Sequence, residues 1–409
     1  MKTDFLPRPL RTLLFLAMLG WPAGQAAADG KMALAAQLPG EACPPPASWT
    51  VFTHQRAQRS DAQRVLAELV ERDVVLLGEQ HDDADHHRWQ LQVLAGLYAL
   101  RPALVIGFEM FPRRLQPVLE RWVAGQLTVS EFLREAEWDT VWSQPAEIYL
   151  PLFHFARLNR IPMLALNIDE KLTRAIAEKG WDDVPVEERE GVGRPAPALP
   201  AYRDILFEVY GEHAGRRGKP GDAAVTDPAF ARFVDSQLAW DRAMAEALAS
   251  RAQPTSRGIR PLLVGIMGSG HLRAGHGVPH QLRALGVRSI GTLLPRPATA
   301  DCADLQPGLA DALFTLPLLP ATLPDPPRLG VSLDSQDGRV LIASVGSGSL
   351  AGQSGLQAGD RISGLAGKPV ARIAEVQAAI RRQPPGTWLP LLIERDGRQI
   401  EVIVRFPAD

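Results

Sequence analysis

The sequence lacks an excess of charge of either sign and lacks a long apolar run after its N-terminal end. Its 409 residues carry a formal net charge of −2 with no basic stripe, so a nucleic-acid partner is not expected. A membrane-spanning helix needs roughly 20 consecutive apolar residues. The segment Leu13–Trp21 is too short and no later segment qualifies, so no transmembrane helix is predicted.

Cysteine is also scarce, since the chain contains only Cys43 and Cys302. A bacterial lipoprotein needs a cysteine directly after its apolar N-terminal segment, and Cys43 lies well beyond that point. Lipidation is therefore not predicted, and any membrane association is peripheral. In an oxidising compartment the two cysteines either pair, joining the N-terminal tail to the last segment of the first domain, or remain free thiols.

The N-terminus has the pattern of a secretory signal peptide. Basic residues precede the apolar segment Leu13–Trp21, and small residues up to Ala28 offer cleavage sites. We therefore predict a signal peptide over residues 1–28 and an N-terminal tail over residues 29–50. The mature protein is expected to be exported to the periplasm, either soluble or associated with the cell envelope.

The remaining composition is that of an ordinary globular protein, with 22% charged and 46% hydrophobic residues. At this length two domains are expected. Between residues 60 and 290, short apolar runs alternate with segments of helical periodicity. This pattern predicts an α/β domain whose mostly parallel sheet has helices on both faces. Its predicted strands are Val74–Leu77, Ala103–Phe108, Ile161–Leu166 and Leu262–Ile266, and its predicted helices are Ala62–Val70, Leu115–Trp122, Val129–Trp138, Ile148–Leu158 and Pro228–Leu248.

Polar side chains follow each predicted strand. The first strand leads into Glu79 and His81, the second into Glu109, the third into Asn167 and the fourth into His271. Because the carboxyl ends of parallel strands share one edge of a sheet, these side chains should converge there. The plainer alternative is that Glu79 and His81 lie on a solvated loop.

Two of the strand ends have the same local design, Gly78-x-x-His81 and Gly268-x-x-His271. The glycine allows a sharp turn that directs the histidine over the edge of the sheet. One such motif is common by chance, but two copies beside strand-end glutamates suit a divalent metal ion or general acid–base work on a bound substrate. The candidate catalytic or metal-binding residues are Glu79, His81, Glu109 and His271.

Other polar residues are placed to support this site. The predicted helix Pro228–Leu248 carries Gln237 within its apolar stripe and Asp241 beside it. Since polar groups on a buried face need partners, these two either bond to nearby caps and loops or orient the histidines. Of His86 and His87, one is expected to face inward and the other to be solvated. The predicted supporting residues are His86, Arg113, Gln237 and Asp241.

Two stretches are rich in proline. The segment from Trp181 to Asp227 contains an expected short helix at Tyr202–Tyr210, and so long an insertion in an α/β domain forms a lid, a partner surface or a mobile segment. The second stretch, Leu316–Pro327, indicates an interdomain linker. The predicted division of the mature chain is an α/β domain over residues 51–310, a linker over residues 311–327 and a second domain over residues 328–409.

The second domain is predicted to be small and β-rich, with Asp396-Gly397 as a hairpin signal between its last two strands. Its predicted strands are Gly330–Leu333, Arg339–Val345, Arg361–Leu365, Leu389–Glu394 and Gln399–Phe406. The runs Arg328-Leu329-Gly330-Val331 and Gly355-Leu356-Gln357-Ala358-Gly359-Asp360-Arg361-Ile362 resemble a PDZ domain of the HtrA-like kind. The resemblance implies a groove that binds the C-termini of proteins as an added strand. The implied peptide-binding residues are Leu329, Gly330, Val331, Val376 and Ile380.

The α/β domain carries a further set of motifs along the chain, Leu76–Asp82 with His86-His87, Phe108–Arg113, Gln237–Ala245 and Gly268–His271. In these motifs it resembles the ChaN family of haem-binding uptake proteins, which is similar to the Tiki proteins and the erythromycin esterases. The resemblance implies that Glu79, His81, Glu109 and His271 are the active residues and that haem is bound through a tyrosine. The sequence does not assign this ligand among its tyrosines, which are Tyr98, Tyr149, Tyr202 and Tyr210.

Three functions from different classes follow. The first is a periplasmic haem-binding protein for haem or iron uptake or handling, as the family resemblance implies. The second is a metal-dependent hydrolase or peptidase of the Tiki type that acts on protein substrates recruited by the PDZ domain. The third is a non-catalytic adaptor in which the PDZ groove alone recognises a partner.

Overall fold

The computed structural model describes residues 43–53, 56–142, 144–216, 226–254, 258–318, 327–336 and 339–408. The predicted signal peptide and most of the predicted N-terminal tail lie outside these ranges. Within them, no helix combines the length and the apolar character that crossing a bilayer requires. The described residues form two sheets, one N-terminal to the proline-rich stretch at residues 316–327 and one C-terminal to it.

The first sheet has the strand order β2-β1-β8-β7-β3-β6-β4-β5. Neighbouring strands from β8 to β5 are parallel, whereas β1 and β2 form an antiparallel edge. The strands are β1 (Ser48–Thr53), β2 (Arg56–Ser60), β3 (Val74–Glu79), β4 (Leu104–Pro112), β5 (Met163–Asn167), β6 (Leu262–Gly268), β7 (Ile290–Arg296) and β8 (Ala312–Thr315). The prediction of a mostly parallel α/β sheet is confirmed.

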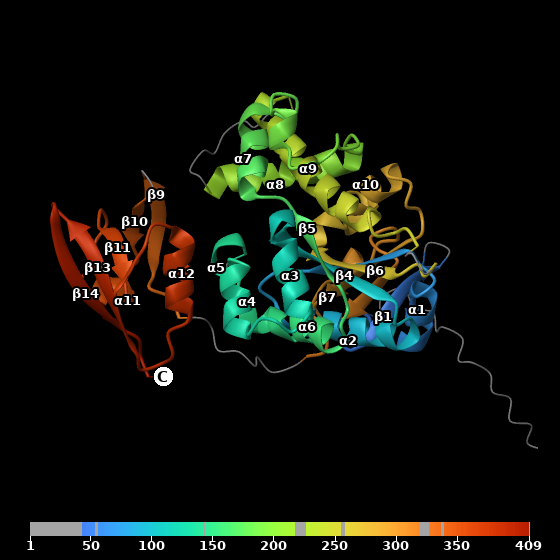
Figure 1. Cartoon of the computed structure of the whole chain (residues 1–409), viewed down its shortest axis with the longest axis horizontal. Coiled ribbons are helices and arrows are strands. Elements are labelled where there is room, and N and C mark those ends of the chain that lie inside the picture. The colour runs from blue at the N-terminus through green and yellow to red at the C-terminus, as the bar shows by residue number, and fades with distance from the viewer. Residues whose placement is uncertain are drawn as a thin grey trace, which may run out of the picture. The chain divides into compact units, whose positions relative to one another are not determined.

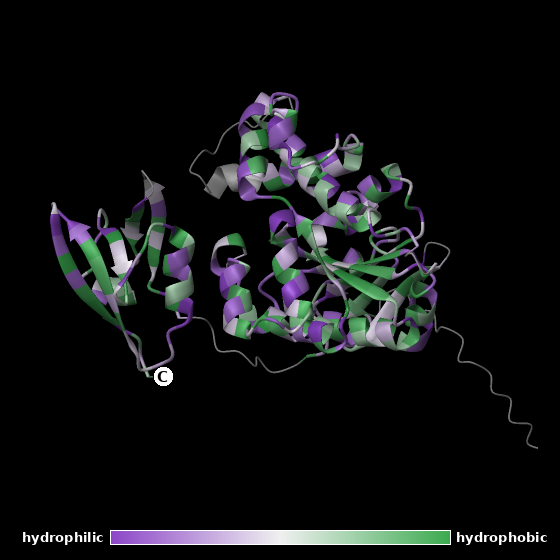
Figure 2. Ribbon diagram, in the orientation of Figure 1, coloured by the Kyte–Doolittle hydropathy of each residue, from purple (hydrophilic) through white to green (hydrophobic). Residues whose placement is uncertain are grey.

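Helices cover both faces of this sheet (Figure 1). The helices described in this part of the chain are α1 (Ala62–Leu69), α2 (Ala84–Leu100), α3 (Gln116–Val123), α4 (Val129–Glu135), α5 (Trp138–Val141), α6 (Ala146–Leu158), α7 (Glu170–Lys179), α8 (Pro200–Arg216), α9 (Pro228–Ala249) and α10 (Val278–Ala284). Strand β3 shows why helices pack on both faces, because its apolar side chains alternate between them. Its Val75 and Leu77 belong to the apolar core that contains α2 and α6, while Val74 and Leu76 belong to the core that contains α9. The central strands are accordingly hydrophobic along their length (Figure 2).

Four strands of the large sheet, β1, β2, β7 and β8, were not among the predicted ones. Strand β2 has the sequence Arg-Ala-Gln-Arg-Ser and lies at the edge of the sheet, so burial imposes no apolar alternation on it. Strand β8 has only four residues, and β7 contains Pro295, which weakens the sequence signal for a strand. Strand β8 falls at the start of the stretch predicted as a linker.

The two cysteines pair. Cys43 and Cys302 form a disulfide whose Cα atoms are 5.3 Å apart. The bond joins the segment before β1 to the segment between β7 and β8, across 259 positions of sequence. Of the two alternatives left open by the sequence, the structure has the disulfide.

The proline-rich insertion after α7 is anchored to the domain at several points. The Gln281 side chain of α10 exchanges hydrogen bonds with the main chain of Ala196, at 2.8 and 2.9 Å. The Gly193 N–H donates to Glu246 of α9 at 3.0 Å. The insertion also contains α8, which is longer than the short helix predicted at Tyr202–Tyr210 and brings Tyr202 into the buried interior.

The second sheet has the order β14-β13-β11-β10-β9, with β12 paired to β11. Its strands are β9 (Val331–Gln336), β10 (Arg339–Val345), β11 (Arg361–Leu365), β12 (Lys368–Pro369), β13 (Trp388–Arg395) and β14 (Arg398–Arg405), with helices α11 (Leu350–Gln353) and α12 (Ile373–Arg381). Asp396 and Gly397 both have positive φ, at 50° and 74°, as a tight two-residue hairpin turn requires. This sheet confirms the predicted small β-rich domain.

Candidate functional site

The site begins where strand β3 ends. All six residues of β3 are buried, and a Cβ atom added to Gly78 would lie 2.4 Å from Cδ2 of Leu294 and 2.7 Å from Oγ of Ser269. A side chain at position 78 would therefore displace its neighbours. The glycine allows β3 to pack closely beside the end of β6, and the chain then places the Glu79 side chain in the interior with no exposed surface.

The buried carboxylate of Glu79 is held by four side chains. Its Oε1 accepts a hydrogen bond from the Tyr149 hydroxyl at 2.8 Å and contacts Nδ1 of His81 at 2.9 Å. Its Oε2 accepts from Gln90 at 3.1 Å and lies 3.4 Å from Nδ1 of His87. Burial alone would raise the pKa of Glu79, but its bonds with the two histidines lower the pKa to about 2. Glu79 is therefore a fixed negative charge at neutral pH.

His81 is the most exposed side chain of the site. Its Nδ1 is bonded to Glu79, and its ring meets the ring of Trp142 edge-on at 4.6 Å between centroids. The side chain is 37% exposed. Burial would lower the pKa of His81, but the hydrogen bond to Glu79 and the charge of Glu109 raise it above its ordinary value. With Nδ1 engaged by the carboxylate, Nε2 is the other ring nitrogen, and it lies beside Gly268.

Glu109 connects the ends of strands β4 and β6. Its Oε2 accepts a hydrogen bond from the main-chain N–H of Gly268 at 2.6 Å, and its own main-chain oxygen accepts from the Asn167 side chain at 2.9 Å. The other carboxylate oxygen, Oε1, is buried and has no hydrogen-bond partner among the described residues. A buried oxygen without a hydrogen-bond donor is costly, which makes this atom notable.

His271 is held by a second carboxylate. Its Nδ1 lies 2.6 Å from Oδ1 of Asp241 on α9, and Oδ2 of Asp241 accepts a hydrogen bond from the Tyr202 hydroxyl at 2.9 Å. Its Nε2 lies 3.5 Å from the unbonded Oε1 of Glu109. Burial opposes the charge on this imidazole, but Asp241 and Glu109 raise the pKa of His271 to about 9. At neutral pH His271 is therefore an imidazolium ion between two carboxylates.

The structure brings together the residues predicted from the strand ends. His271 and Glu109 are in contact, and a Cβ atom added to Gly268 would lie 2.9 Å from the His81 ring and 3.7 Å from Glu109. The predicted metal set is not assembled, however. Among the residues with described positions, no three His, Cys, Asp or Glu side chains are arranged to hold a metal ion. The reason is that most of the donor atoms of the set are already bonded to each other, to Tyr149 or to the main chain.

The structure places the predicted supporting residues in different surroundings. Asp241 is fully buried and bonds to His271. Arg113 instead bonds to the main-chain oxygens of Ala243 and Glu190, at 2.7 and 3.3 Å, so it joins α9 and the insertion to the end of β4. Gln237 is half-buried and has no described hydrogen bond to the site.

The prediction that one of His86 and His87 is solvated is wrong, because both are buried. His86 Nδ1 accepts a hydrogen bond from the Gln80 N–H at 2.7 Å, which fixes the turn after β3. His87 lies against Glu79 and so supports the site directly. The helix α2 packs on the sheet from its first turn, and this tertiary contact buries both rings.

Three residues that support the site were not identified as such from the sequence. Tyr149 and Gln90 bond to Glu79, and Tyr202 bonds to Asp241. A signal for Gln90 existed, because it lies three residues after His87 on the same face of a helix. Tyr149 and Tyr202 are far from their partners in sequence and carried no such signal.

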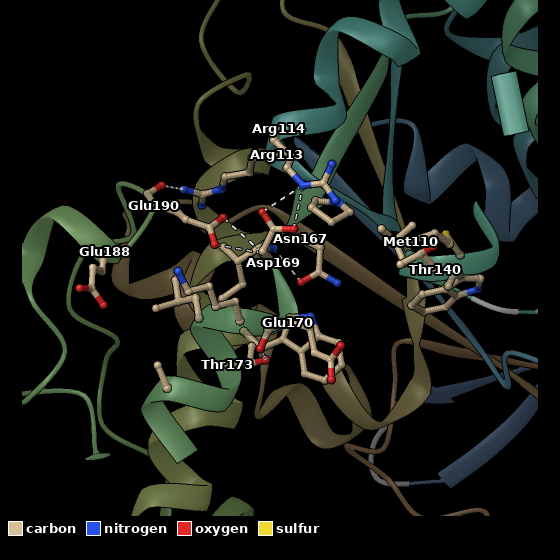
Figure 3. A pocket seen from close by; sticks show the side chains of 18 residues that line it. Met110, Arg113, Arg114, Thr140, Asn167, Asp169, Glu170, Thr173, Glu188 and Glu190 are labelled. Atoms are coloured by element: carbon tan, nitrogen blue, oxygen red, sulfur yellow. Dashed lines mark hydrogen bonds and ion pairs between the residues drawn. The ribbon is translucent and has the colours of Figure 1, made fainter. Parts of the chain in front are cut away.

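A cleft of about 980 Å³ opens beside this site, between the ends of β4 and β5 and the insertion (Figure 3). Trp142 and Trp240, which pack on the rings of His81 and His271, are part of its wall. Its wall contains both apolar and charged residues. The lining includes Met110, Arg113, Arg114, Trp142, Ile168, Asp169, Lys171, Leu172, Glu190 and Trp240.

The cationic groups of the cleft are not equally available. Arg114 is already paired with Asp169 and Glu137, at 2.8 and 2.7 Å. Lys171, in the first turn of α7, is exposed and has no described ion pair. A ligand with a carboxylate would therefore meet Lys171 without first breaking a salt bridge.

The predicted peptide-binding residues of the second domain lie near β9. This strand is at the end of the sheet order and pairs only with β10 among the described residues, so its outer edge is available to another strand. Leu329, Val376 and Ile380 are buried in the apolar core, whereas Val331 is only partly buried. Gly330 has φ of 73°, and a Cβ atom there would lie 2.4 Å from Cβ of Ser349.

Comparison with known proteins gives separate matches for the first and the second domain. Residues 327–405 match the PDZ domain family, and 72 residues are 36% identical to the periplasmic serine endoprotease DegP of Escherichia coli, covering 18% of this chain and 15% of DegP. This chain thus spans only a small part of the curated relative. A serine endoprotease structure from Yersinia pestis is 28% identical over 19% of this chain and 28% of its own, with a TM-score of 0.18.

The first domain matches a different family. A structure of cofacial haem binding to ChaN of Campylobacter jejuni is 17% identical to this chain, covers 65% of this chain and 96% of its own, and has a TM-score of 0.48. Residues 65–282 match the family described as haem-binding uptake, Tiki superfamily, ChaN. Since that match extends over more than half of the 409 residues, the chain belongs to the ChaN family of haem-binding uptake proteins.

Proposed function

We propose that this protein binds haem in the cleft beside His81 and that it handles haem or iron outside the cytoplasm. The observation that carries the proposal is the large cleft with apolar and cationic walls, one of whose residues, Trp142, packs on the ring of His81. Family membership supports the same function. The predicted signal peptide supports the export of the protein, and the uptake role follows from the family.

The residues of the cleft fit the chemical groups of haem. Haem is a flat apolar ring with two carboxylates and an iron, and iron in proteins is held by histidine, cysteine, methionine or tyrosine. The cleft volume of about 980 Å³ is at the upper end of the range of small-molecule sites, roughly 300–1,000 Å³. Trp142, Ile168 and Trp240 offer apolar walls, and Lys171 offers a cation for a carboxylate.

Titration of the purified full chain with hemin tests this proposal. A saturable shift of the Soret band at micromolar hemin is expected. Lys171→Ala should weaken the binding, whereas Lys179→Ala should not, because Lys179 is exposed at the other end of α7 and lies outside the cleft. Absence of a saturable shift in the unmodified protein would contradict the proposal.

The second domain is proposed to bind the C-termini of proteins along β9. The free edge of this strand supports the proposal, because an extended peptide can add to it through main-chain hydrogen bonds. Leu329, Val376 and Ile380 then form the apolar core beneath the peptide, and the amides at Leu329–Val331 are the expected partners of its terminal carboxylate.

Fluorescence anisotropy with a labelled decapeptide that ends in an apolar residue tests this binding. The same peptide with an amidated C-terminus is the matched control, since it lacks only the carboxylate. Binding of the free peptide and not of the amide is expected. Filling the groove by substitution at Gly330 is a poor test, because the positive φ and the contact with Ser349 would strain the loop. Equal binding of both peptides would contradict the proposed mode.

A second candidate function is hydrolysis, and the unbonded Oε1 of Glu109 beside the protonated His271 favours it. A carboxylate oxygen that accepts no hydrogen bond can take a proton from an attacking water, and an imidazolium can donate one to a leaving group. The expected substrates are proteins recruited through the PDZ domain. Glu109→Gln should then abolish turnover of a peptide substrate whose C-terminus is bound by the PDZ domain. If the wild-type protein hydrolyses no member of a panel of peptides and esters, haem binding is left as the function.

A further inference from the structure

We propose that strand β14 is an interface through which two copies of this chain associate, with the two β14 strands paired antiparallel about Ile403. The proposal goes beyond haem and peptide binding, because β14 lies at the opposite end of the second sheet from β9 and belongs to neither proposed site. It assigns a partner to a surface of the second domain that the proposed functions leave unused.

Strand β14 is an unprotected edge strand. It pairs only with β13 among the described residues, and Figure 1 shows it as the outermost strand of its sheet. Its residues pair with those of β13 in one continuous register, and only Val404 is buried. Proteins usually protect an edge of this length with a proline, a bulge or a covering element. β14 contains neither proline nor bulge, so its edge is open to another strand.

The outer face of the β13–β14 hairpin is rich in exposed apolar side chains. Residues that lie directly opposite each other in an antiparallel pair share one face of the sheet. Trp388 is 61% exposed and Ile403 is 45% exposed, and Leu392 is exposed on the same face. Apolar side chains gathered on a surface mark an interaction site. The cross-strand pairs of this face are Trp388–Arg405, Pro390–Ile403 and Leu392–Glu401.

The main-chain groups of β14 determine which residues can pair across the open edge. The N–H of Phe406 donates to the main-chain oxygen of Thr387 at 2.8 Å, so Phe406 directs its groups toward β13. Because the groups alternate in direction along a strand, those of Glu401, Ile403 and Arg405 point to the open edge. Two copies can then form main-chain hydrogen bonds only by pairing odd-numbered residues with each other. Such pairing keeps the outer faces of both copies on the same side of the joined sheet.

The charges of β14 select one register. With Ile403 opposite Ile403 of the second copy, Glu401 of each copy lies opposite Arg405 of the other, which gives two ion pairs. The neighbouring registers, centred on Val402 and Val404, place Glu401 and Arg405 respectively opposite Ile403 and form no ion pair. Opposite charges stabilise a cross-strand pair, and like charges destabilise it. The register about Ile403 therefore has the best charge complementarity, and it is symmetric, as a dimer of identical chains requires.

The same register joins the apolar faces. The central row of side chains across the dimer consists of Pro390 and Ile403 from each copy. In each flanking row, Arg405 of one copy lies between its own Trp388 and Glu401 of the other. The Arg405 guanidinium already lies over the Trp388 ring, 4.8 Å from its centroid, so it is placed beside the position that the incoming carboxylate would take.

The overlap of the two strands is short. It covers Glu401–Arg405, because the next residue to face a partner is Gln399, and it would meet Pro407, which has no N–H to donate. So short a pair predicts a reversible dimer whose population depends on concentration. The edge of β9 remains free for a peptide in such a dimer.

Sedimentation velocity of the full chain over a wide range of concentration tests the proposal. Hemin is left out, so that haem cannot join two copies. The wild type should shift from monomer to dimer as its concentration rises. Ile403→Lys should remain monomeric, because it places two like charges opposite each other at the centre of the interface. Leu158→Lys is the matched control, since it changes an exposed apolar residue on α6 and should dimerise like the wild type.

Charge reversal tests the register. Glu401→Arg should weaken the dimer, because each new cation would face Arg405 of the other copy. Glu401→Arg combined with Arg405→Glu should restore the dimer, since each pair again joins opposite charges. Far-UV circular dichroism of every variant checks that it is folded, as expected for changes at exposed positions.

A cross-link locates the interface directly. In Ile403→Cys the two substituted residues would face each other with Cα atoms about 5.5 Å apart, a separation that a disulfide can bridge. The native cysteines do not compete, because Cys43 and Cys302 are bonded to each other. Mild oxidation should therefore give a covalent dimer on a non-reducing gel. Gln399→Cys is the control and should give none, because Gln399 lies four residues from the centre of the pair.

A wild type that stays monomeric over the whole concentration range would overturn the proposal. A dimer that persists in Ile403→Lys would also overturn it, because the copies would then be joined elsewhere. Cross-linking of Gln399→Cys and not of Ile403→Cys would exclude the proposed register. These outcomes do not depend on whether the protein binds hemin.

Discussion

The two Gly-x-x-His strand ends begin from the same local sequence and finish in different environments. At the end of β3, the carboxylate that holds His81 comes from Glu79, two residues earlier in the chain. At the end of β6, the carboxylate that holds His271 comes from Asp241, which lies 30 residues earlier on α9. Both carboxylates are held in turn by a tyrosine hydroxyl.

The difference between them concerns exposure and charge. The His81 side chain is 37% exposed and its ring packs on Trp142 of the cleft wall, whereas the His271 ring is enclosed by Asp241, Glu109 and Trp240. The same glycine and histidine spacing therefore yields one partly exposed histidine and one that is buried between two carboxylates. Four experiments test this comparison.

Removing the Glu79 carboxylate should have the largest effect on the free energy of unfolding. Glu79→Ala leaves Tyr149, Gln90 and the two histidines without their common partner in the interior, and breaking a buried ionic network of this kind costs about 3–5 kcal/mol. Urea unfolding measures the change in free energy. Glu68→Ala is the control, because Glu68 is an exposed partner of Arg64 and its loss should cost less than about 0.5 kcal/mol. Equal effects of the two substitutions would show that the Glu79 network contributes nothing to stability.

The effect of the Asp241 carboxylate on His271 should appear in the pH dependence of the free energy of unfolding. The pKa of His271 is about 9 in the folded protein against 6.5 in the unfolded chain, so the stability from its charge is complete below about pH 6.5 and is lost as the pH rises to 9. The loss amounts to about 3 kcal/mol, since one pKa unit corresponds to roughly 1.4 kcal/mol. Urea midpoints between pH 6 and 9.5 measure it.

Asp241→Asn should flatten this decline, because the main charge that raises the pKa of His271 is removed. Asp204→Asn is the matched control, since Asp204 is exposed on α8. A decline of the same size in Asp241→Asn and in the wild type would mean that His271 is not charged by Asp241.

Tyr149 and Tyr202 allow the hydrogen bonds that hold the two carboxylates to be compared directly. Tyr149→Phe and Tyr202→Phe each remove a hydrogen bond to a charged carboxylate, which is worth about 1.5–3 kcal/mol. Tyr149 should have the larger effect, because its hydroxyl also lies 3.0 Å from the main-chain oxygen of His81. Tyr98→Phe should change the unfolding free energy by less than about 0.5 kcal/mol. A larger loss in Tyr202→Phe would reverse the expected order.

The smallest effect is expected at Gly268, the glycine of the second Gly-x-x-His motif. In Gly268→Ala the new Cβ would lie 2.9 Å from Cε1 of His81, so the ring must shift. The cost is expected to be about 1 kcal/mol, at the lower end of the range for overpacking, because the partly exposed ring can move. Gly270→Ala is the control, as no atom lies within 4 Å of its added Cβ. Thermal denaturation and the ring signals of His81 in NMR spectra distinguish the two.

Much of the fold follows from local pattern. The buried strands β3, β4, β5 and β6 were predicted because burial on both faces leaves a continuous apolar run, and β10 and β11 agree with their predicted bounds. The strands that the prediction omitted are short, at the edge of the sheet, or interrupted by proline, as β2 and β7 show. Their pairing is fixed by neighbouring strands and by the disulfide from Cys43 to Cys302, not by their own sequence.

The sequence by itself determined the four strand-end residues of the site, because parallel strands with polar carboxyl ends must meet at one edge. It also indicated the family and the PDZ domain through specific motifs. Only the tertiary structure decided that Asp241 holds His271, that both His86 and His87 are buried, and that Tyr149 and Tyr202 serve as hydrogen-bond donors. These contacts join segments far apart in the chain, and a hydrogen bond between such segments depends on packing that no local spacing encodes.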